Sequence, residues 1–206
     1  MWIIRSDMKN LFDYLRELLD RNVHPLERED EIWQRYGRTV AVMMLDSSGF
    51  SRTTEQHGIV HFLTHLMQMR EIIDGVCKER DCHMLRFEAD NVFAAFDHPD
   101  EAIKTAFDIH KAIQDEQLML DHREPFRVCI GIGYGKLLWS ETLEGYFGEE
   151  INLASKLGED TADGGETLIS ENAYRHADGN LVAGFSKLNL SIAGIEATDY
   201  RHGKDA

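Results

Sequence analysis

The stretch RFEADNVFAAF, residues 86–96, constrains the fold most, because two strand-like runs flank a turn signal. The run HMLRF (83–87) precedes the turn and the run VFAAF (92–96) follows it. Between them, Asp90 and Asn91 are residue types that tolerate left-handed backbone and bond their own main chain. The pattern predicts an antiparallel hairpin with Asp90 at its tip. A simple turn former is the plain interpretation of Asp90, and the rest of the chain bears on whether it does more.

Strand-like and helical patterns surround this hairpin. An apolar, β-branched run at 39–46 predicts a buried strand, and a long helical periodicity follows it. The glycines late in the run 126–139 indicate a close backbone approach. Mixed strands and helices around a hairpin predict an α+β layer, one sheet covered by helices. The remaining elements are expected as helices at 54–78, 99–114 and 149–160, a strand and short helix in 166–177, and closing strands in 179–201.

The front of the chain reads as a helical extension. Residues 8–21 carry leucines at helical spacing, Pro25 breaks the pattern, and a second short helix is expected to end near Gly37. We therefore predict an N-terminal helical extension over residues 1–37 and a catalytic-size domain over residues 38–206. A helix that packs on the domain and a helix that dimerises or transmits a signal are both open interpretations.

Composition excludes two classes of partner. The formal net charge of −15 argues against nucleic acid and against an anionic membrane, since both require a basic face. Three cysteines without a CxxC pair predict a reducing, cytoplasmic setting. The first residues contain neither a membrane-spanning run nor a signal-peptide pattern, so no membrane insertion is expected.

Two acidic residues stand at the ends of predicted strand elements. Asp46 ends the strand at 39–46, and Asp90 lies at the hairpin tip, so the two carboxylates can meet at one edge of a sheet. Paired carboxylates repel unless a cation joins them, and Mg²⁺ or Mn²⁺ takes carboxylate oxygens while keeping sites for water and phosphate. The turn SSGFS after Asp46 offers backbone N–H groups around Gly49 for phosphate oxygens. The set predicts a metal–triphosphate site.

Five motifs in order resemble one family. LDSSGFS resembles the first metal motif of class III nucleotidyl cyclases, the adenylate/guanylate cyclase family, and RFEADNVFAAF resembles their metal-binding hairpin. The likeness continues through VCIGIGYGKLL, YFGEEINLASKLGED and GGETLISENAY, and covers about residues 39–176. The resemblance implies a ferredoxin-like α+β domain with a central, mostly antiparallel sheet. It also implies a homodimer with active sites at the subunit interface.

The resemblance assigns roles position by position. Asp46 and Asp90 match the two metal-binding aspartates, and Ser47 would add its carbonyl. Gly49 and Phe50 match the phosphate turn. Asn152 matches the residue that orients the ribose, and Lys156, one helical turn later, matches the residue that stabilises transition-state charge. The implied enzyme is a phosphorus–oxygen lyase that uses two divalent ions, Mg or Mn, to convert a nucleoside triphosphate, with ATP or GTP favoured, into a 3′,5′-cyclic nucleotide and pyrophosphate.

Several positions depart from the family pattern. Lys156 replaces an arginine and so loses the rigid bidentate fork. Arg86 replaces the usual base-recognising lysine, and its acidic partner would fall at Gly145, with Glu144 adjacent. Ala89 replaces the glycine before the hairpin aspartate. Substrate choice therefore stays open among ATP, GTP and pyrimidine triphosphates.

The sequence leaves other interpretations open. A non-catalytic cyclase-like module that binds nucleotide or dimerises in signalling is the main alternative. A diguanylate cyclase relative ranks low, because its Gly-Gly-Asp/Glu-Glu-Phe hairpin is absent. Glu88 is favoured as a solvated strand residue over a third metal ligand. His57, His61 and His65 have spacing that could bind a metal, but a helix surface or a dimer contact is favoured. GYGKLL lacks both the P-loop and the dinucleotide-binding pattern, so it is not interpreted as a phosphate loop.

Overall fold

The computed structural model describes residues 10–141, 145–192 and 195–203, with side chains described outside 191–197. The chain divides into two compact units. The first unit comprises residues 1–39 and 136–149, and the second comprises residues 40–135 and 150–206. The functional division at residue 37 into an extension and a catalytic domain stays a prediction.

The first unit is a small helical body with a strand pair. The predicted front helices are observed as α1 (Leu11–Asp20) and α2 (Glu29–Tyr36), joined by a 3₁₀ turn at Pro25–Arg28. Asn10 caps α1, because its side chain accepts a 3.0 Å hydrogen bond from the Asp13 N–H. The end of β4 (Val128–Ser140) pairs antiparallel with the short strand β5 (Gly145–Phe147), which the sequence did not predict. A separate apolar core is formed by Leu11, Leu18, Ile32 and Tyr36.

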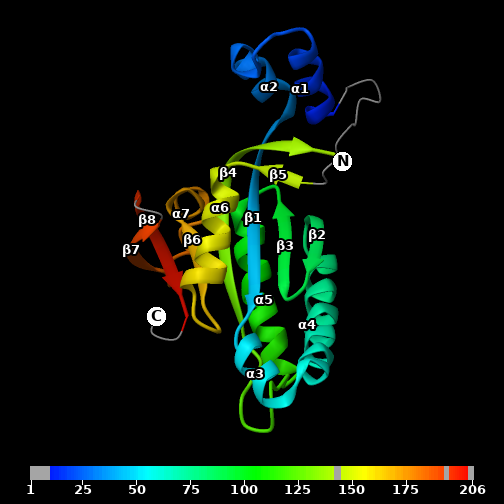
Figure 1. Ribbon diagram of the computed structural model, residues 1–206. Helices are drawn as coiled ribbons and strands as arrows, with labels where there is room; N and C mark the ends of the chain where they lie inside the picture. Colours follow the sequence, from blue (N-terminus) through cyan, green and yellow to red (C-terminus); the bar gives the residue numbers. More distant parts are fainter. Residues whose placement is uncertain (1–9, 142–144, 193–194, 204–206) are drawn as a thin grey trace. The chain divides into compact units, whose positions relative to one another are not determined.

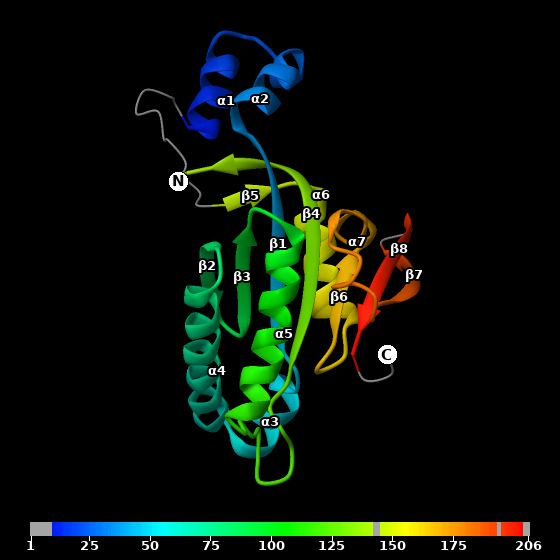
Figure 2. The same ribbon diagram turned by 180° about the vertical axis from the view of Figure 1, so that it is seen from behind.

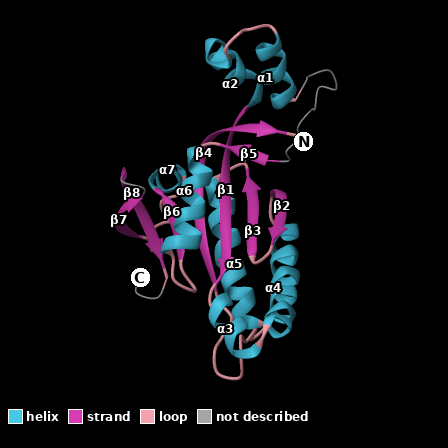
Figure 3. Ribbon diagram, in the orientation of Figure 1, coloured by secondary structure: helices cyan, strands magenta, loops and turns pink. Residues whose placement is uncertain are grey.

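The second unit is built on one sheet. Its strands lie in the order β2-β3-β1-β4-β6-β8-β7. Strands β4 and β6 run parallel, whereas β2, β3 and β1, like β6, β8 and β7, pair antiparallel. The predicted α+β layer with a mostly antiparallel sheet is confirmed (Figure 3). The strand bounds are β1 Gly37–Ser47, β2 Cys82–Glu88, β3 Asn91–Phe96, β6 Thr167–Ser170, β7 Ser186–Ile192 and β8 Ile195–His202.

Helices cover both faces of this sheet. In β1, Ala41, Met43 and Leu45 point into the core shared with α4 (Ile59–Glu79) and α5 (Pro99–Asp115). Helix α6 (Glu149–Ser155) lies on the opposite face, as the two views in Figures 1 and 2 show. Because strand side chains alternate, the residues of β1 between the core positions face the α6 side.

Alternating glycines in β4 let α6 lie against the strand. A Cβ atom at Gly131 would lie 2.0 Å from the carbonyl oxygen of Ala154, and one at Gly133 would lie 2.4 Å from that of Glu150. The Glu150 side chain then accepts hydrogen bonds from the Tyr134 N–H (3.0 Å) and the Ser170 hydroxyl (2.8 Å). The predicted close backbone approach is therefore confirmed and has a specific partner.

The hairpin turn differs by one residue from the prediction. Glu88 lies opposite Asn91 in the β2–β3 register, so the two turn residues are Ala89 and Asp90. Ala89 adopts the left-handed conformation, with φ +49°, and Asn91 is the first residue of β3. Asp90 occupies the tip as predicted. Asn91 pairs with Glu88 although it is a turn-forming residue type, because the cross-strand register decides where β3 begins.

The long helix predicted over 54–78 is in fact two helices. Helix α3 (Phe50–His57) ends at Gly58, whose φ of +84° belongs to the left-handed region, and α4 begins at the next residue. The Gly58 N–H still donates to the Thr54 carbonyl at 2.9 Å. The periodicity of apolar residues continues across this point, so only the backbone reveals the break. Among the described residues, no helix combines the length and apolar character needed to span a bilayer.

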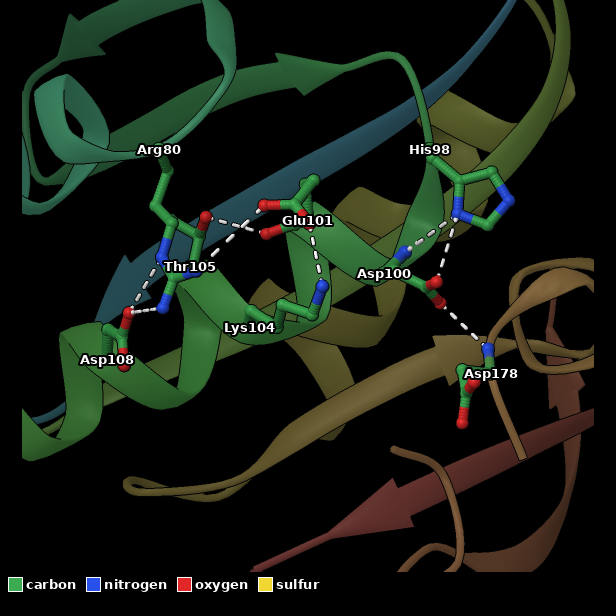
Figure 4. Close-up of polar contacts among 8 residues, drawn as sticks. All are labelled: Arg80, His98, Asp100, Glu101, Lys104, Thr105, Asp108 and Asp178. Atoms are coloured by element: carbon green, nitrogen blue, oxygen red, sulfur yellow. Dashed lines mark hydrogen bonds and ion pairs between the residues drawn. The ribbon is translucent and has the colours of Figure 1, made fainter. Parts of the chain in front are cut away.

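Polar contacts anchor α5 at its first half (Figure 4). Arg80, in the turn after α4, pairs with the Asp108 carboxylate and lies 4.0 Å from the Glu101 carboxylate. On the other side, the Asp100 carboxylate accepts a 2.8 Å hydrogen bond from the Asp178 N–H, just beyond α7 (Glu171–His176). These contacts tie α5 to both of its neighbouring helices.

Candidate functional site

The structure brings the two predicted metal-binding aspartates together. Asp46 and Ser47 end β1, and the adjacent strand β3 begins directly after Asp90. The Ser47 hydroxyl donates to a carboxylate oxygen of Asp90 at 3.0 Å, and the Ser47 N–H donates to a carboxylate oxygen of Asp46 at 2.7 Å. One buried serine therefore bonds to both carboxylates.

The electrostatics of this pair favour a cation. The pKa of Asp46 is raised to about 6, first by burial and then by the negative charge of Asp90. A hydrogen bond with Asp90 and the charge of Glu159 act in the same direction, whereas the Ser47 N–H opposes them. Two carboxylates that disfavour joint ionisation are stabilised by a positive ion between them. The arrangement therefore fits a hard divalent cation.

The donor set is incomplete in a way that suits a nucleotide site. Among the described residues, no group of three or more His, Cys, Asp or Glu side chains is arranged to hold a metal. The oxygen donors that Ser47 brings together are the carboxylates of Asp46 and Asp90, whereas a carbonyl ligand from Ser47 stays a prediction. Mg²⁺ sites in phosphate-transfer enzymes commonly use one or two carboxylates and complete their shell with water and phosphate.

The turn after Ser47 presents backbone donors. Gly49 has a φ of +94° and precedes α3, whose N-terminus has no side-chain cap. The first N–H groups of α3, beginning with Phe50, therefore lack partners within the helix. Such a terminus also carries partial positive charge, which favours a phosphate group. The Phe50 ring packs edge-on against Phe62, with 4.7 Å between ring centroids, and this contact steadies the turn.

The face of the sheet beside Asp46 carries an arginine over an aromatic ring. Arg86 of β2 lies opposite Phe93 of β3, which lies opposite Met44 of β1. The Arg86 guanidinium carbon is 5.0 Å from the centroid of the Phe93 ring. Arg86 is exposed, as is Glu88 at the end of the same strand. The proposed base-recognising residue thus lies on the sheet that carries the aspartates, whereas Glu144 falls outside the described residues.

Asn152 and Lys156 lie on α6 and on the turn that follows it. Asn152 is exposed on α6, and Lys156 opens a π-helical turn at Lys156–Thr161. The Ala162 N–H donates to the Leu157 carbonyl at 2.9 Å, the wider i to i−5 pattern of a π turn. In the described part of the chain, no hydrogen bond joins either side chain to Asp46 or Asp90.

Two residues of this region were not predicted from the sequence. Glu159 acts electrostatically on Asp46 from the π-helical turn, and nothing in the local sequence indicates that approach. Phe93 forms the ring under Arg86, and its alternation with Val92 and Ala94 in β3 was a usable signal. Both depend on which elements become neighbours.

The rings of the three helix histidines lie in a row, with one pair tilted and the other edge-on. The His57 and His61 centroids lie 5.0 Å apart, and the His61 and His65 centroids lie 4.6 Å apart. The His61 ring nitrogen Nε2 bonds to the Leu120 carbonyl at 2.8 Å. These contacts tie α4 to the segment that follows α5.

Comparisons with known proteins agree with this architecture. A search among curated proteins found no match. Similar solved structures include an adenylate/guanylate cyclase/hydrolase from Silicibacter pomeroyi, with 22% identity, a TM-score of 0.67, and 82% of this chain and 99% of that chain covered. A non-canonical dimeric guanylyl cyclase domain of the RhoGC fusion protein from Blastocladiella emersonii is 19% identical, with a TM-score of 0.63 and coverage of 80% of this chain and 96% of that chain.

A third similar structure is the catalytic core of a rhodopsin-guanylyl cyclase with converted specificity in complex with ATPalphaS. It is 20% identical, with a TM-score of 0.67 and coverage of 81% of this chain and 95% of that chain. These likenesses establish the fold. The family model of the adenylate and guanylate cyclase catalytic domain matches residues 33–197, which is most of the chain. The protein therefore belongs to the adenylate and guanylate cyclase catalytic domain family.

Proposed function

We propose that the protein is a nucleotidyl cyclase that converts a nucleoside triphosphate into a 3′,5′-cyclic nucleotide and pyrophosphate. The observation that carries the proposal is the pairing of Asp46 and Asp90 through Ser47, directly before the uncapped N-terminus of α3. Carboxylates for cations and N–H groups for phosphate thus stand side by side in the chain. Membership of the cyclase family supports this type of reaction.

Each group has a separate task in the proposed reaction. Divalent cations bound by Asp46 and Asp90 would neutralise the triphosphate and acidify the ribose 3′-hydroxyl. The Phe50 N–H would hold phosphate oxygens, Asn152 would orient the ribose, and Lys156 would balance charge as pyrophosphate leaves. The 3′-oxygen attacks the α-phosphorus in line, so a P–O bond forms as the bond to pyrophosphate breaks.

The substrate is proposed to be a purine nucleotide bound between two copies of the chain. Arg86, which lies over the buried Phe93 ring, would provide a cation for a planar base, and ATP and GTP offer the larger ring system. Asn152 and Lys156 lie on elements that make no hydrogen bond to the aspartates within the described residues. We therefore propose that these two residues act from a partner protomer, in a homodimeric site.

The test is an assay of the purified protein with each of ATP, GTP, CTP and UTP, with Mg²⁺ or with Mn²⁺. Mass spectrometry should detect a cyclic product from at least one of the four. Asp46→Asn and Asp90→Asn remove one charge each without changing side-chain size, and we expect each to lower turnover by about 10²-fold or more. Asp81→Asn, in the exposed turn before β2, is the matched control and should behave like wild type.

Two results would contradict the proposed cyclase activity. Full turnover in Asp46→Asn or in Asp90→Asn would show that the substituted aspartate is not needed for the reaction. Binding of a nucleotide and Mn²⁺ without product from any triphosphate would favour the alternative, a cyclase-like module that binds nucleotide without converting it. Circular dichroism of all variants separates these results from a folding defect.

A further inference from the structure

A cavity of about 560 Å³ lies between the end of α5, the start of β4 and the segment that leads into β6, and Asp46 and Asp90 are not among its lining residues. Its lining comes entirely from the second compact unit. Apolar walls come from residues such as Ile113, Leu118 and Phe126. Small-molecule sites in proteins have this size and this mainly apolar lining with a few polar groups.

Among the described residues, the polar part of the lining contains no acid. Arg127, Gln114 and His110 line the cavity, but no described aspartate or glutamate does, although the chain carries 37 of them. His110 is held by a 3.0 Å contact between its Nε2 and the Thr167 hydroxyl, and burial and nearby His202 lower its pKa to about 4. His110 is therefore neutral at pH 7. Among the described lining residues, Arg127 is the one that carries a formal charge.

Arg127 is free to meet a ligand. Its side chain is exposed, and within the described residues it has no hydrogen bond or ion pair to another side chain. Its stem lies beside Gly164 and Gly165, with its Cβ 3.1 Å from where a Cβ would stand at Gly164. An unpaired guanidinium at the edge of an apolar cavity favours a ligand that has an apolar body and one anionic end.

One wall of the cavity also supports the phosphate turn. The Arg127 carbonyl accepts a 3.0 Å hydrogen bond from the Ser48 N–H. A methyl of Leu120 lies 2.9 Å from where a Cβ would stand at Gly49. Glu124 pairs with Arg52 in the first turn of α3. The segment 116–127 therefore touches the cavity on one side and the residues around Gly49 on the other.

We propose that this cavity binds a small amphipathic carboxylate, with its carboxylate on Arg127 and its apolar body against Ile113, Leu118 and Phe126. Binding would shift the segment 116–127 and, through Ser48 and Gly49, change turnover at the aspartate site. The effect on turnover rests on the proposed function, whereas binding itself does not.

The binding test uses decanoate as the probe, below its micelle concentration, with isothermal titration calorimetry on the full chain. Decyltrimethylammonium has the same apolar body with a positive end, and acetate has the carboxylate without the body. We expect decanoate to bind and the two comparison compounds to bind at least about tenfold more weakly. Equal binding of the cationic compound would overturn the assignment of Arg127.

Two matched variants locate the site. Gln114→Trp places a large ring at the cavity from an exposed position of α5, and Gln68→Trp makes the same change at an exposed position of α4 outside the cavity. Gln114→Trp should weaken decanoate binding at least about tenfold. Gln68→Trp should leave binding unchanged, and equal affinity of the two variants would overturn the site.

The coupling test measures cyclic-nucleotide turnover with and without decanoate in wild type and Gln114→Trp. A change in wild type that disappears in Gln114→Trp is expected. Decanoate that binds without altering turnover would overturn the coupling and leave the binding site standing. If no triphosphate gives a product, the proposed function fails, and the calorimetry still decides whether the cavity is a site.

Discussion

At the scale of single residues, position 156 carries a lysine where the family pattern has arginine, at the start of a π-helical turn. If this lysine balances charge in the transition state, Lys156→Met should lower kcat by about 10²-fold. Lys156→Arg keeps the charge and adds the bidentate fork, so its kcat should equal or exceed that of wild type. Steady-state kinetics with the preferred triphosphate and Mn²⁺ would measure both.

The KM of Lys156→Met distinguishes a role of the lysine in the transition state from a role in substrate binding. A group used only in the transition state alters kcat while KM for the triphosphate stays near its wild-type value. Unchanged kcat in Lys156→Met would show that the lysine is an ordinary helix residue. A rise in KM alone would assign it to substrate binding.

Asp199 is the second residue with an unusual environment. It is fully buried in β8 opposite Ser170, and neither carboxylate oxygen has a hydrogen-bond partner among the described residues. Burial, followed by the charges of Glu150 and Glu171, raises its pKa to about 6. The folded protein therefore holds a proton between about pH 4 and pH 6 that the unfolded chain has already lost.

This difference makes a pH-dependent prediction. The free energy of unfolding should fall as pH rises from about 4 through about 6, because the folded state binds more protons than the unfolded state in that window. Asp199→Asn removes the charge and should stabilise the protein at pH 7 by on the order of 2 kcal/mol. The pKa of Asp46 is also raised, so the free energy of unfolding of wild type contains contributions from both aspartates. The difference between wild type and Asp199→Asn isolates the contribution of Asp199.

Urea unfolding at several pH values would measure the effect. The stabilising difference should vanish near pH 4, where both forms are neutral at this position. Asp81→Asn, at an exposed turn, serves as the control for removing a carboxylate from the surface. A destabilised Asp199→Asn at pH 7 would contradict the prediction and indicate an ionised aspartate with an unidentified partner.

At the scale of elements, the seating of α6 on β4 depends on glycine. Gly131→Ala would put a methyl 2.0 Å from the Ala154 carbonyl oxygen and 2.5 Å from the Gly158 nitrogen, both of which are main-chain atoms with little freedom to move. We expect a loss of about 3 kcal/mol in the free energy of unfolding, as for other overpacked interiors. Denaturant midpoints would measure it.

The chain offers a matched control for this substitution. Gly75 lies in the interior of α4, and nothing stands within 4 Å of where its Cβ would be. Gly75→Ala should therefore stabilise the protein by about 0.5–1 kcal/mol through helix propensity. The same substitution should thus lower the free energy of unfolding in the strand and raise it in the helix. Equal effects at the two positions would show that the backbone around Gly131 shifts to accept a methyl at little cost.

At the scale of the whole molecule, the proposed site requires two copies of the chain. If one protomer supplies the aspartates and its partner supplies Lys156, Asp90→Asn and Lys156→Met proteins should each be inactive alone. Equal amounts mixed and allowed to exchange subunits should recover about a quarter of wild-type turnover, because half of the dimers are mixed and each has one intact site of two. Turnover should also depend on protein concentration.

The mixing experiment also has a result that would contradict a site shared between two protomers. Absence of recovery over a wide range of concentrations, with subunit exchange verified by native mass spectrometry, would place all residues of the site in one chain. The unmixed variants at the same total concentration are the controls.

Most of the architecture could be predicted from local patterns. The hairpin with Asp90 at its tip, the helix over 99–114 and the glycine-marked strand 126–139 depend on residues close together in the chain, and all three are observed. The cyclase family was also recognisable, because its motifs are short and contiguous. The roles of the individual site residues stay predictions.

The remaining features depend on neighbours that are distant in the chain. A single left-handed glycine at position 58 divides a continuous apolar periodicity into two helices, and strand register moves the hairpin turn to Ala89 and Asp90. The sequence by itself determined most of the helices and strands, and the family to which the chain belongs, because propensity and motif are local properties. Only the tertiary structure decided that Ser47 bonds both aspartates and that a cavity lies beside the turn at Ser48 and Gly49. It also decided that Asp199 is buried and that, within the described residues, its carboxylate has no hydrogen-bond partner. Desolvation, charge repulsion and close packing all depend on which elements meet in space.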